Sequence, residues 1–295
     1  MELYLDKTKD VELGAFYECK NIYNQDIDIY DKKTNEIILS LKKNIIDQQL
    51  YNFDPKLVKL SKMDSANRGN AAGRTTIAGL QRGKTNWKAY PTDLVDRHGN
   101  VIKEGSSSNF FKYNDGRISK RARSNTVASV AIGGFDKSPQ FPCRLTHYTK
   151  KNLKEYQTIF PLSQNISEHY FDYFPDKWLN QFSVYENSPD DFLIPKTNFS
   201  TITLKHDFRT ACHQDKGDGK HGLTCFTIKN CGEFSGGELI FPEYDVAVNI
   251  DQGDLLIFNP HHCHCNNPLK GTGRMSMVYY LREKMDKCLN LTNDK

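Results

Sequence analysis

Apolar and polar positions alternate in short runs along this chain, and the alternation is most regular after Phe199. There the runs are separated by Gly, Pro and Asn, a pattern typical of a sandwich or barrel of short strands. Gly253 to Phe258 is predicted to be a short buried strand that follows a Gly-Asp turn. Arg274 to Leu281 is predicted to be the last strand. Residues two apart share a face, so Arg274, Ser276, Val278 and Tyr280 would lie on one side of it.

The part of the chain before Phe199 is less regular. Asn125 to Gly134 is an apolar run that predicts a strand, and Ser40 to Phe53 fits an amphipathic helix. Lys151 to Phe182 is rich in aromatic residues and helical in period, with breaks near Pro161 and Pro175. These helices are expected to brace a sheet.

Two segments are expected to lack regular structure. Met63 to about Arg123 is rich in turn residues and basic residues, which predicts loops over a scaffold. The tail after Asp286 is polar and is expected to fray. No repeat or linker divides the 295 residues, so a single domain over 1–295 is predicted. Within it, residues 1–150 would form a supporting and substrate-loop region, and residues 151–285 the helices and the β core. The fold class is mostly β with flanking helices (α+β).

Candidate metal ligands lie in the strand-rich half. His213 and Asp215 are two residues apart, so both can face one metal ion from one extended segment. Two histidines and one carboxylate form the facial triad of non-haem Fe(II) oxygenases. The third ligand is predicted to be His264, beyond the strand that ends at Phe258, with His261 and His262 as alternatives.

Zinc held near Cys263, His264 and Cys265 is a rival hypothesis, although the chain has no C-x-x-C pair. Arg274 and Ser276 would point together into the pocket. A guanidinium grips a carboxylate with two parallel hydrogen bonds, so this pair suits a dicarboxylate cosubstrate. The alternative for Arg274 is a surface ion pair.

The segment from Asn198 to Lys284 resembles the double-stranded β-helix core (jelly-roll, cupin-like) of 2-oxoglutarate/Fe(II) dioxygenases. The likeness is greatest to the branch of TET 5-methylcytosine oxidases and J-binding-protein thymine hydroxylases. It is carried by the following stretches: Asn198 to Thr203, Phe208 to Asp218, Ser235 to Tyr244, the Gly253-Asp254 strand, and His264 with Arg274-x-Ser276. Asn67 to Gly73 and Ser129 to Thr146 match more loosely.

The resemblance implies a reaction and its cofactors. His213, Asp215 and His264 would hold Fe(II), while Arg274 and Ser276 fix the far carboxylate of 2-oxoglutarate, and O2 is the oxidant. The target would be the 5-methyl group of thymine or 5-methylcytosine in nucleic acid, with DNA expected. Such a base must leave its stack to reach the metal. Two alternatives stay open: a hydroxylase of a protein side chain or small metabolite, and an inactive nucleic-acid-binding module.

Charge and composition add a candidate binding surface and a compartment. Net charge is only +4, but basic residues cluster among aromatic ones between Arg68 and Arg123, as suits a phosphate backbone and unstacked bases. The candidate substrate-binding residues are Arg68, Arg74, Arg117, Lys120, Arg121 and Arg123. The N-terminus lacks a signal-peptide pattern, and the 8 cysteines are irregularly spaced. An intracellular protein of the cytoplasm or nucleus, with reduced thiols, is therefore expected.

Overall fold

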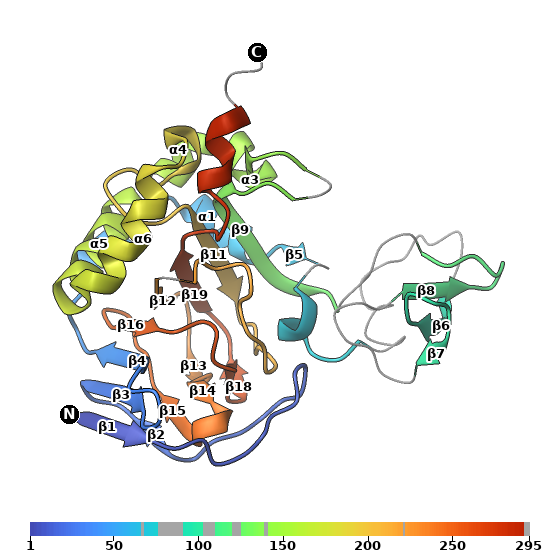
Figure 1. The fold of residues 1–295 in the computed structure, drawn as a ribbon, viewed down its shortest axis with the longest axis horizontal. Helices are drawn as coiled ribbons and strands as arrows, with labels where there is room; N and C mark the ends of the chain where they lie inside the picture. Colours follow the sequence, from blue (N-terminus) through green and yellow to red (C-terminus); the bar gives the residue numbers. More distant parts are fainter. Residues whose placement is uncertain are drawn as a thin grey trace.

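The computed structural model describes residues 1–65, 68–75, 91–102, 110–119, 125–138, 141–220 and 222–291. Its largest feature is a 10-stranded sheet in the order β1-β3-β4-β16-β12-β19-β11-β9-β10, with β5 paired to β9 (Figure 1). The strands of this large sheet are β1 (Glu2–Leu5), β3 (Ile27–Asp31), β4 (Ile37–Lys42), β5 (Asp64–Ser65), β9 (Val127–Phe135), β10 (Arg144–Leu145), β11 (Thr201–His206), β12 (Thr224–Asn230), β16 (Leu255–Phe258) and β19 (Arg274–Tyr280).

A smaller sheet packs against one face of the large sheet. Its order is β17-β14-β15-β2, and its strands are β2 (Ile22–Tyr23), β14 (Leu239–Phe241), β15 (Val246–Val248) and β17 (Cys265–Asn266). The apolar core between the sheets includes Phe226 and Leu256 of the large sheet and Phe241 and Val246 of the small one. Beside it, β13 (Phe234–Gly236) pairs with β18 (Leu269–Gly271). This confirms the predicted mostly β fold with a jelly-roll core.

Helices cover the other face of the large sheet. They are α1 (Pro55–Ser61), α3 (His147–Lys151), α4 (Leu153–Gln157), α5 (Phe160–Tyr173) and α6 (Pro175–Glu186). Met277 and Tyr279 of β19 pack against this helical side, whereas Val278 and Tyr280 belong to the core between the sheets. The predicted helical segment is confirmed. Pro161 and Pro175 lie in the first turns of α5 and α6, where a missing N–H leaves no hydrogen bond unmade.

The structure also contains short 3-10 helices: η1 (Gln48–Tyr51), η2 (Gly69–Ala72), η3 (Asp190–Phe192), η4 (Pro242–Tyr244) and η5 (Asp286–Leu291). The amphipathic helix predicted over Ser40 to Phe53 is wrong. Instead β4 continues to Lys42 and pairs with β16, and Asn44 then adopts a left-handed φ of 56° that an α-helix cannot contain. The apolar residues of β4 therefore belong to a strand and not to an amphipathic helix.

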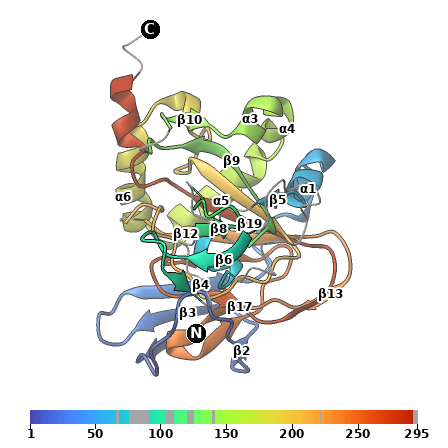
Figure 2. The same ribbon diagram turned by 90° about the vertical axis from the view of Figure 1, so that its right-hand side faces the viewer.

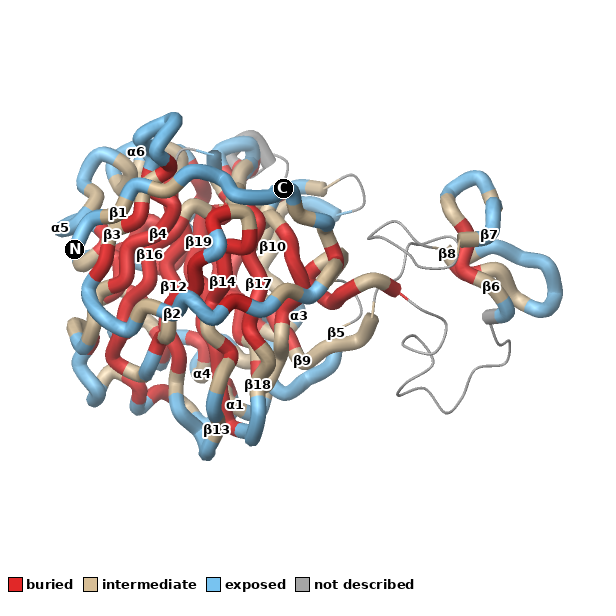
Figure 3. The backbone as a smooth tube through the Cα atoms, turned by 90° about the horizontal axis from the view of Figure 1, so that it is seen from below, coloured by how far each residue is buried: buried red, intermediate tan, exposed pale blue. Residues whose placement is uncertain are grey.

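The segment predicted as loops contains a sheet of its own. Strands β6 (Pro91–Val95), β7 (Val101–Ile102) and β8 (Phe110–Tyr113) form an antiparallel sheet in the order β7-β6-β8. Leu94 and Phe111 form its small buried core. Figures 1 and 3 show this sheet standing apart from the main body. A short apolar strand is hard to recognise among many turn residues.

Two further expectations are corrected near the C-terminus. The tail predicted to fray forms η5 up to Leu291, and Cys288 within it is joined to Cys143 by a disulfide. The expectation of reduced thiols is therefore wrong for these two cysteines, while Cys19, Cys212, Cys225, Cys231, Cys263 and Cys265 are free. Figure 2 shows η5 beside α6, at the end of the molecule remote from the N-terminus. No helix within the described residues is long and apolar enough to cross a membrane.

Candidate metal centre and its cavity

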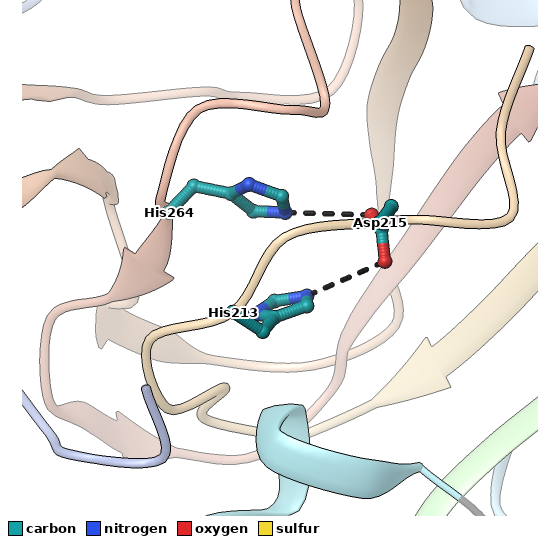
Figure 4. Close-up of side chains that lie close together, drawn as sticks. All are labelled: His213, Asp215 and His264. Carbon is teal, nitrogen blue, oxygen red and sulfur yellow. Dashed lines mark ion pairs between the residues drawn. The ribbon is translucent and has the colours of Figure 1, made fainter. Parts of the chain in front are cut away.

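Two short segments bring the three predicted ligands together. His213 and His264 form an isolated antiparallel bridge, in which each backbone N–H donates to the other residue's carbonyl at 3.0 Å. The two ring centroids are 4.3 Å apart. Asp215 lies across from both rings, with carboxylate oxygens 3.8 Å from His213 Nε2 and 3.4 Å from His264 Nε2 (Figure 4). One potential ligand atom from each residue lies within 4.8 Å of the others.

Backbone carbonyls fix the orientation of both imidazoles. His213 Nδ1 is 2.8 Å from the carbonyl of Ala211, and His264 Nδ1 is 2.9 Å from that of His262. A carbonyl only accepts, so each Nδ1 carries the hydrogen and each Nε2 presents a lone pair towards Asp215. This is how metal-binding histidines are usually held. The donor set therefore fits a divalent ion such as Fe(II).

Electrostatics keep His213 and Asp215 in the protonation states that a metal requires. Burial lowers the pKa of His213 to about 3, and His264 adds to the effect while Asp215 opposes it. Burial raises the pKa of Asp215, but the attraction of His213 and His264 outweighs this and the net shift is downward. At neutral pH the site offers a neutral His213 imidazole and a carboxylate, as metal binding demands.

The alternative ligands lie elsewhere. Nδ1 of His262 is 3.4 Å from the hydroxyl of Tyr244. Cys212, Cys263 and Cys265 belong to a separate apolar cluster with Cys19. Among the described residues, His213, Asp215 and His264 are the single group of three or more ligand-type side chains close enough to hold one ion. The geometry therefore favours His264 over its neighbours and gives no support to a zinc site built on Cys263 and Cys265.

Arg274 and Ser276 lie on the inner face of β19. Both are buried, and Arg274 Nη1 donates to Ser276 Oγ at 2.6 Å. The guanidinium lies over the ring of Phe226 at 5.7 Å. Within the described residues no carboxylate forms an ion pair with it, and burial lowers its pKa to about 10. A buried cation without a carboxylate partner is well suited to an anionic ligand. Arg274 is not the surface ion-pair partner considered as an alternative.

Space for the Arg274 side chain depends on one glycine. Gly237 adopts φ of +79°, and a Cβ at this position would lie 3.2 Å from Arg274 Nε. A residue with a side chain would be strained by the backbone and would crowd the guanidinium. The Ser-Gly-Gly-Glu stretch of the sequence therefore leaves room for the guanidinium of Arg274.

A cavity of about 430 Å³ opens in front of the triad. His213 and Asp215 line it together with side chains from several elements, among them Arg68, Phe135, Thr203, Lys205, Asp218 and Tyr280. Sequence reasoning did not single out Thr203, Lys205 or Asp218. Alternation along β11 could have found the first two, because Thr203 and Lys205 share the face opposite to Ile202 and Leu204. Asp218 accepts a hydrogen bond from Thr224 at 3.0 Å, and burial raises its pKa.

The predicted substrate-binding residues occupy different places. Arg68 lines the cavity, and burial lowers its pKa while Asp215 opposes the shift. Arg74 forms an ion pair with Glu12. Arg117 follows β8 in the separate small sheet and pairs with Asp115 at 2.7 Å. Lys120, Arg121 and Arg123 lie outside the described residues. The structure thus places Arg68 at the metal centre and Arg117 away from it.

Comparisons with known proteins match the part of the chain that holds this centre. The model of Tet_JBP, described as the oxygenase domain of the 2OGFeDO superfamily, matches residues 131–283. The thymine dioxygenase JBP1 of Trypanosoma brucei brucei is 34% identical over 149 residues, which is 48% of this chain and 17% of that protein. JBP1 of Crithidia fasciculata is 33% identical over 152 residues, or 50% of this chain and 18% of that protein. The matched segment is thus less than a fifth of each relative.

A solved structure described as NgTET1 in complex with 5mC DNA aligns with 99% of this chain and 90% of its own, at 10% identity and a TM-score of 0.48. A 2OG-Fe(II) oxygenase family protein from Burkholderia pseudomallei aligns with 53% of this chain and 68% of its own, at 15% identity and a TM-score of 0.36.

Proposed function

The chain belongs to the Tet_JBP family, the oxygenase domain of the 2OGFeDO superfamily, and from this premise we propose that it hydroxylates the 5-methyl group of a pyrimidine in nucleic acid. The proposed cofactors are Fe(II), 2-oxoglutarate and O2, and the proposed base is thymine or 5-methylcytosine in DNA. The observation that carries the proposal is the triad of His213, Asp215 and His264 at the cavity, together with the buried pair Arg274 and Ser276.

Each residue of the centre has a proposed task. His213 and His264 donate Nε2 lone pairs to the metal, and Asp215 adds one negative charge. Arg274 and Ser276 hold the far carboxylate of 2-oxoglutarate. With these bound, the metal and O2 supply a hydroxylation in which one oxygen atom enters succinate, CO2 is released, and the other oxygen atom enters the methyl C–H bond. The protein positions the reactants and keeps the site closed.

Geometry also limits how a base reaches the centre. His213 and Asp215 line the cavity, and all three residues of the triad are buried or half-buried, whereas a pyrimidine methyl in duplex DNA lies inside the major groove. The base must therefore be extruded or presented single-stranded. The relatives that share about a third of the matched residues are thymine dioxygenases, and this similarity supports a pyrimidine methyl over other C–H groups.

The test is a nucleoside assay. Purified protein with Fe(II), ascorbate and 2-oxoglutarate is incubated with single- and double-stranded oligonucleotides that contain thymine or 5-methylcytosine, and the digested nucleosides are measured by mass spectrometry. A hydroxymethyl product is expected. It should disappear in Asp215→Ala and persist in Asp191→Ala, which removes an exposed carboxylate. Consumption of 2-oxoglutarate with no change in any nucleoside would instead favour a protein or metabolite hydroxylase.

A further inference from the structure

One charged side chain of the cavity has no task in the proposal above. Lys205 lies on β11, directly opposite Ser276 of β19 in the antiparallel register. Paired residues of adjacent strands point to the same face, so Lys205 shares the inner face with Ser276 and Arg274. It also lines the cavity with His213 and Asp215. Lys205 is thus a neighbour of Ser276 across the strand pair and of two predicted metal ligands in the cavity.

The ammonium of Lys205 has no protein partner among the described residues: neither a hydrogen bond nor an ion pair joins its Nζ to them. Burial lowers its pKa, the charges of Arg68 and Arg274 act in the same direction, and the charges of Asp215 and Asp218 oppose them. A partly buried cation beside two other cations is costly unless an anion joins it. The carboxylates nearby do not provide that contact. Asp215 faces the two histidines, and Asp218 accepts from Thr224.

We propose that Lys205 binds the 2-oxo-acid end of the cosubstrate, by donating to the carboxylate that is bonded to the keto carbon. The inference rests on the proposed function, because that end of 2-oxoglutarate is the one which meets the metal. Arg274 and Ser276 then hold the distal carboxylate, so each carboxylate of the dianion has its own cation.

Position and charge both favour this end. Lys205 lines the cavity together with His213 and Asp215, whereas Arg274 and Ser276 are not among its lining residues. The negative charge of Asp215 also favours the charged form of Lys205, and the positive charge of Arg274 opposes it. The distal site already holds a guanidinium and a hydroxyl that bond each other. A neutral carbonyl of a base would leave the charge of Lys205 uncompensated, whereas a carboxylate neutralises it.

The test measures binding rather than turnover. Protein loaded with Fe(II) without oxygen is titrated by calorimetry with 2-oxoglutarate and with 2-oxopentanoate, which keeps the 2-oxo-acid end but lacks the distal carboxylate. Lys205→Met should weaken both ligands by a similar factor of about ten or more, because one charge-assisted contact is lost from each. Arg274→Lys should weaken 2-oxoglutarate alone. Lys270→Met, which removes an exposed lysine of β18, should change neither affinity.

Each result decides a different point. Unchanged affinities in Lys205→Met overturn the inference and leave the proposed function intact. Loss of 2-oxoglutarate binding alone would assign Lys205 to the distal carboxylate, and loss of oligonucleotide binding alone would assign it to nucleic acid; both overturn the inference. A wild-type protein that binds metal but no 2-oxoglutarate overturns the proposed function itself. Lys205→Gln gives a second neutral variant, and thermal unfolding of both should match or exceed the wild-type midpoint, since an uncompensated charge is removed.

Discussion

At the scale of single residues, the backbone bridge selects His264 among three neighbouring histidines. The bridge pairs it with His213, while His262 lies beside Tyr244. Loss of a residue that only hydrogen-bonds a ligand typically lowers metal affinity by roughly 10–100-fold. His264→Ala removes a ligand itself and should therefore reduce Fe(II) affinity by more than that. His262→Ala and His261→Ala should retain most of it. Metal content after dialysis measures this. If His262→Ala lost the metal while His264→Ala retained it, the third ligand would be His262 and not His264.

The arginine of β19 gives a second prediction at this scale. Arg274→Lys should raise the apparent KM for 2-oxoglutarate about tenfold or more, because an ammonium cannot reproduce two parallel hydrogen bonds from a planar group. Steady-state succinate formation at varied 2-oxoglutarate measures the change. Ser276→Ala should have a smaller effect, since one hydroxyl is lost and the guanidinium stays. An unchanged KM in Arg274→Lys would exclude a bidentate role.

How far the sequence could predict the centre depends on the distance between its parts. His213 and Asp215 are close in sequence, so their common face could be predicted from spacing alone. His264 was already the predicted third ligand, with His261 and His262 as alternatives, and the bridge, which pairs segments about fifty residues apart, favours it over them. Lys205 needed the register of β11 against β19. Pairing of this kind comes from the whole fold, and a single sequence does not carry it.

At the scale of elements, the disulfide ties η5 to the segment before β10. Cys143 and Cys288 are 145 residues apart, and cross-linking so long a loop restricts the unfolded chain by about 4–5 kcal/mol in the chain-entropy model. Cys143→Ser or added reductant should therefore lower the urea midpoint and leave metal binding unchanged. Cys231→Ser, at an exposed free cysteine, is the control. Equal midpoints for oxidised and reduced protein would contradict the prediction.

Elements differed in how well the sequence predicted them. Strands β9, β16 and β19 were predicted because long apolar runs or clean alternation mark them. The helices α5 and α6 were predicted because their segment is helical in period, with breaks near Pro161 and Pro175. Strand β4 was mistaken for part of a helix, because apolar positions from Ser40 onward fit both periods over so short a run. The pairing of β4 with both β3 and β16 settles the choice.

At the scale of the whole molecule, the described basic residues predicted to bind nucleic acid lie in different places, and Arg74 among them pairs with Glu12. Arg68 lies in the cavity, and Arg117 belongs to the small sheet that stands apart in Figure 1. Replacing Arg117, Lys120, Arg121 and Arg123 by alanine should weaken DNA binding. Each lost phosphate contact should lower the slope of log affinity against log salt by about 0.7–0.9. Fluorescence anisotropy at several salt concentrations measures both quantities.

A matched variant separates the local effect from that of net charge. Lys7, Lys9, Lys32 and Lys33 lie near the N-terminal strands, and their joint replacement by alanine removes the same charge. It should leave the salt slope almost unchanged. Equal slopes for the two variants would show that the region of Arg117 does not contact the backbone, and absence of salt-sensitive binding by the wild type would remove nucleic acid from the proposal.

Protein atoms alone make the paired backbone hydrogen bonds between His213 and His264, and backbone carbonyls orient both rings. The fold itself should therefore position the ligands, in contrast to small proteins that fold around zinc. Binding and removal of the metal ion should therefore take place at a preformed site, and other divalent ions such as Mn(II) or Co(II) should also bind there. Chelator-treated protein should keep its circular dichroism spectrum and regain full metal occupancy within the mixing time of fresh Fe(II). The supply of ions around the protein, rather than the folding pathway, would then decide which one occupies the centre.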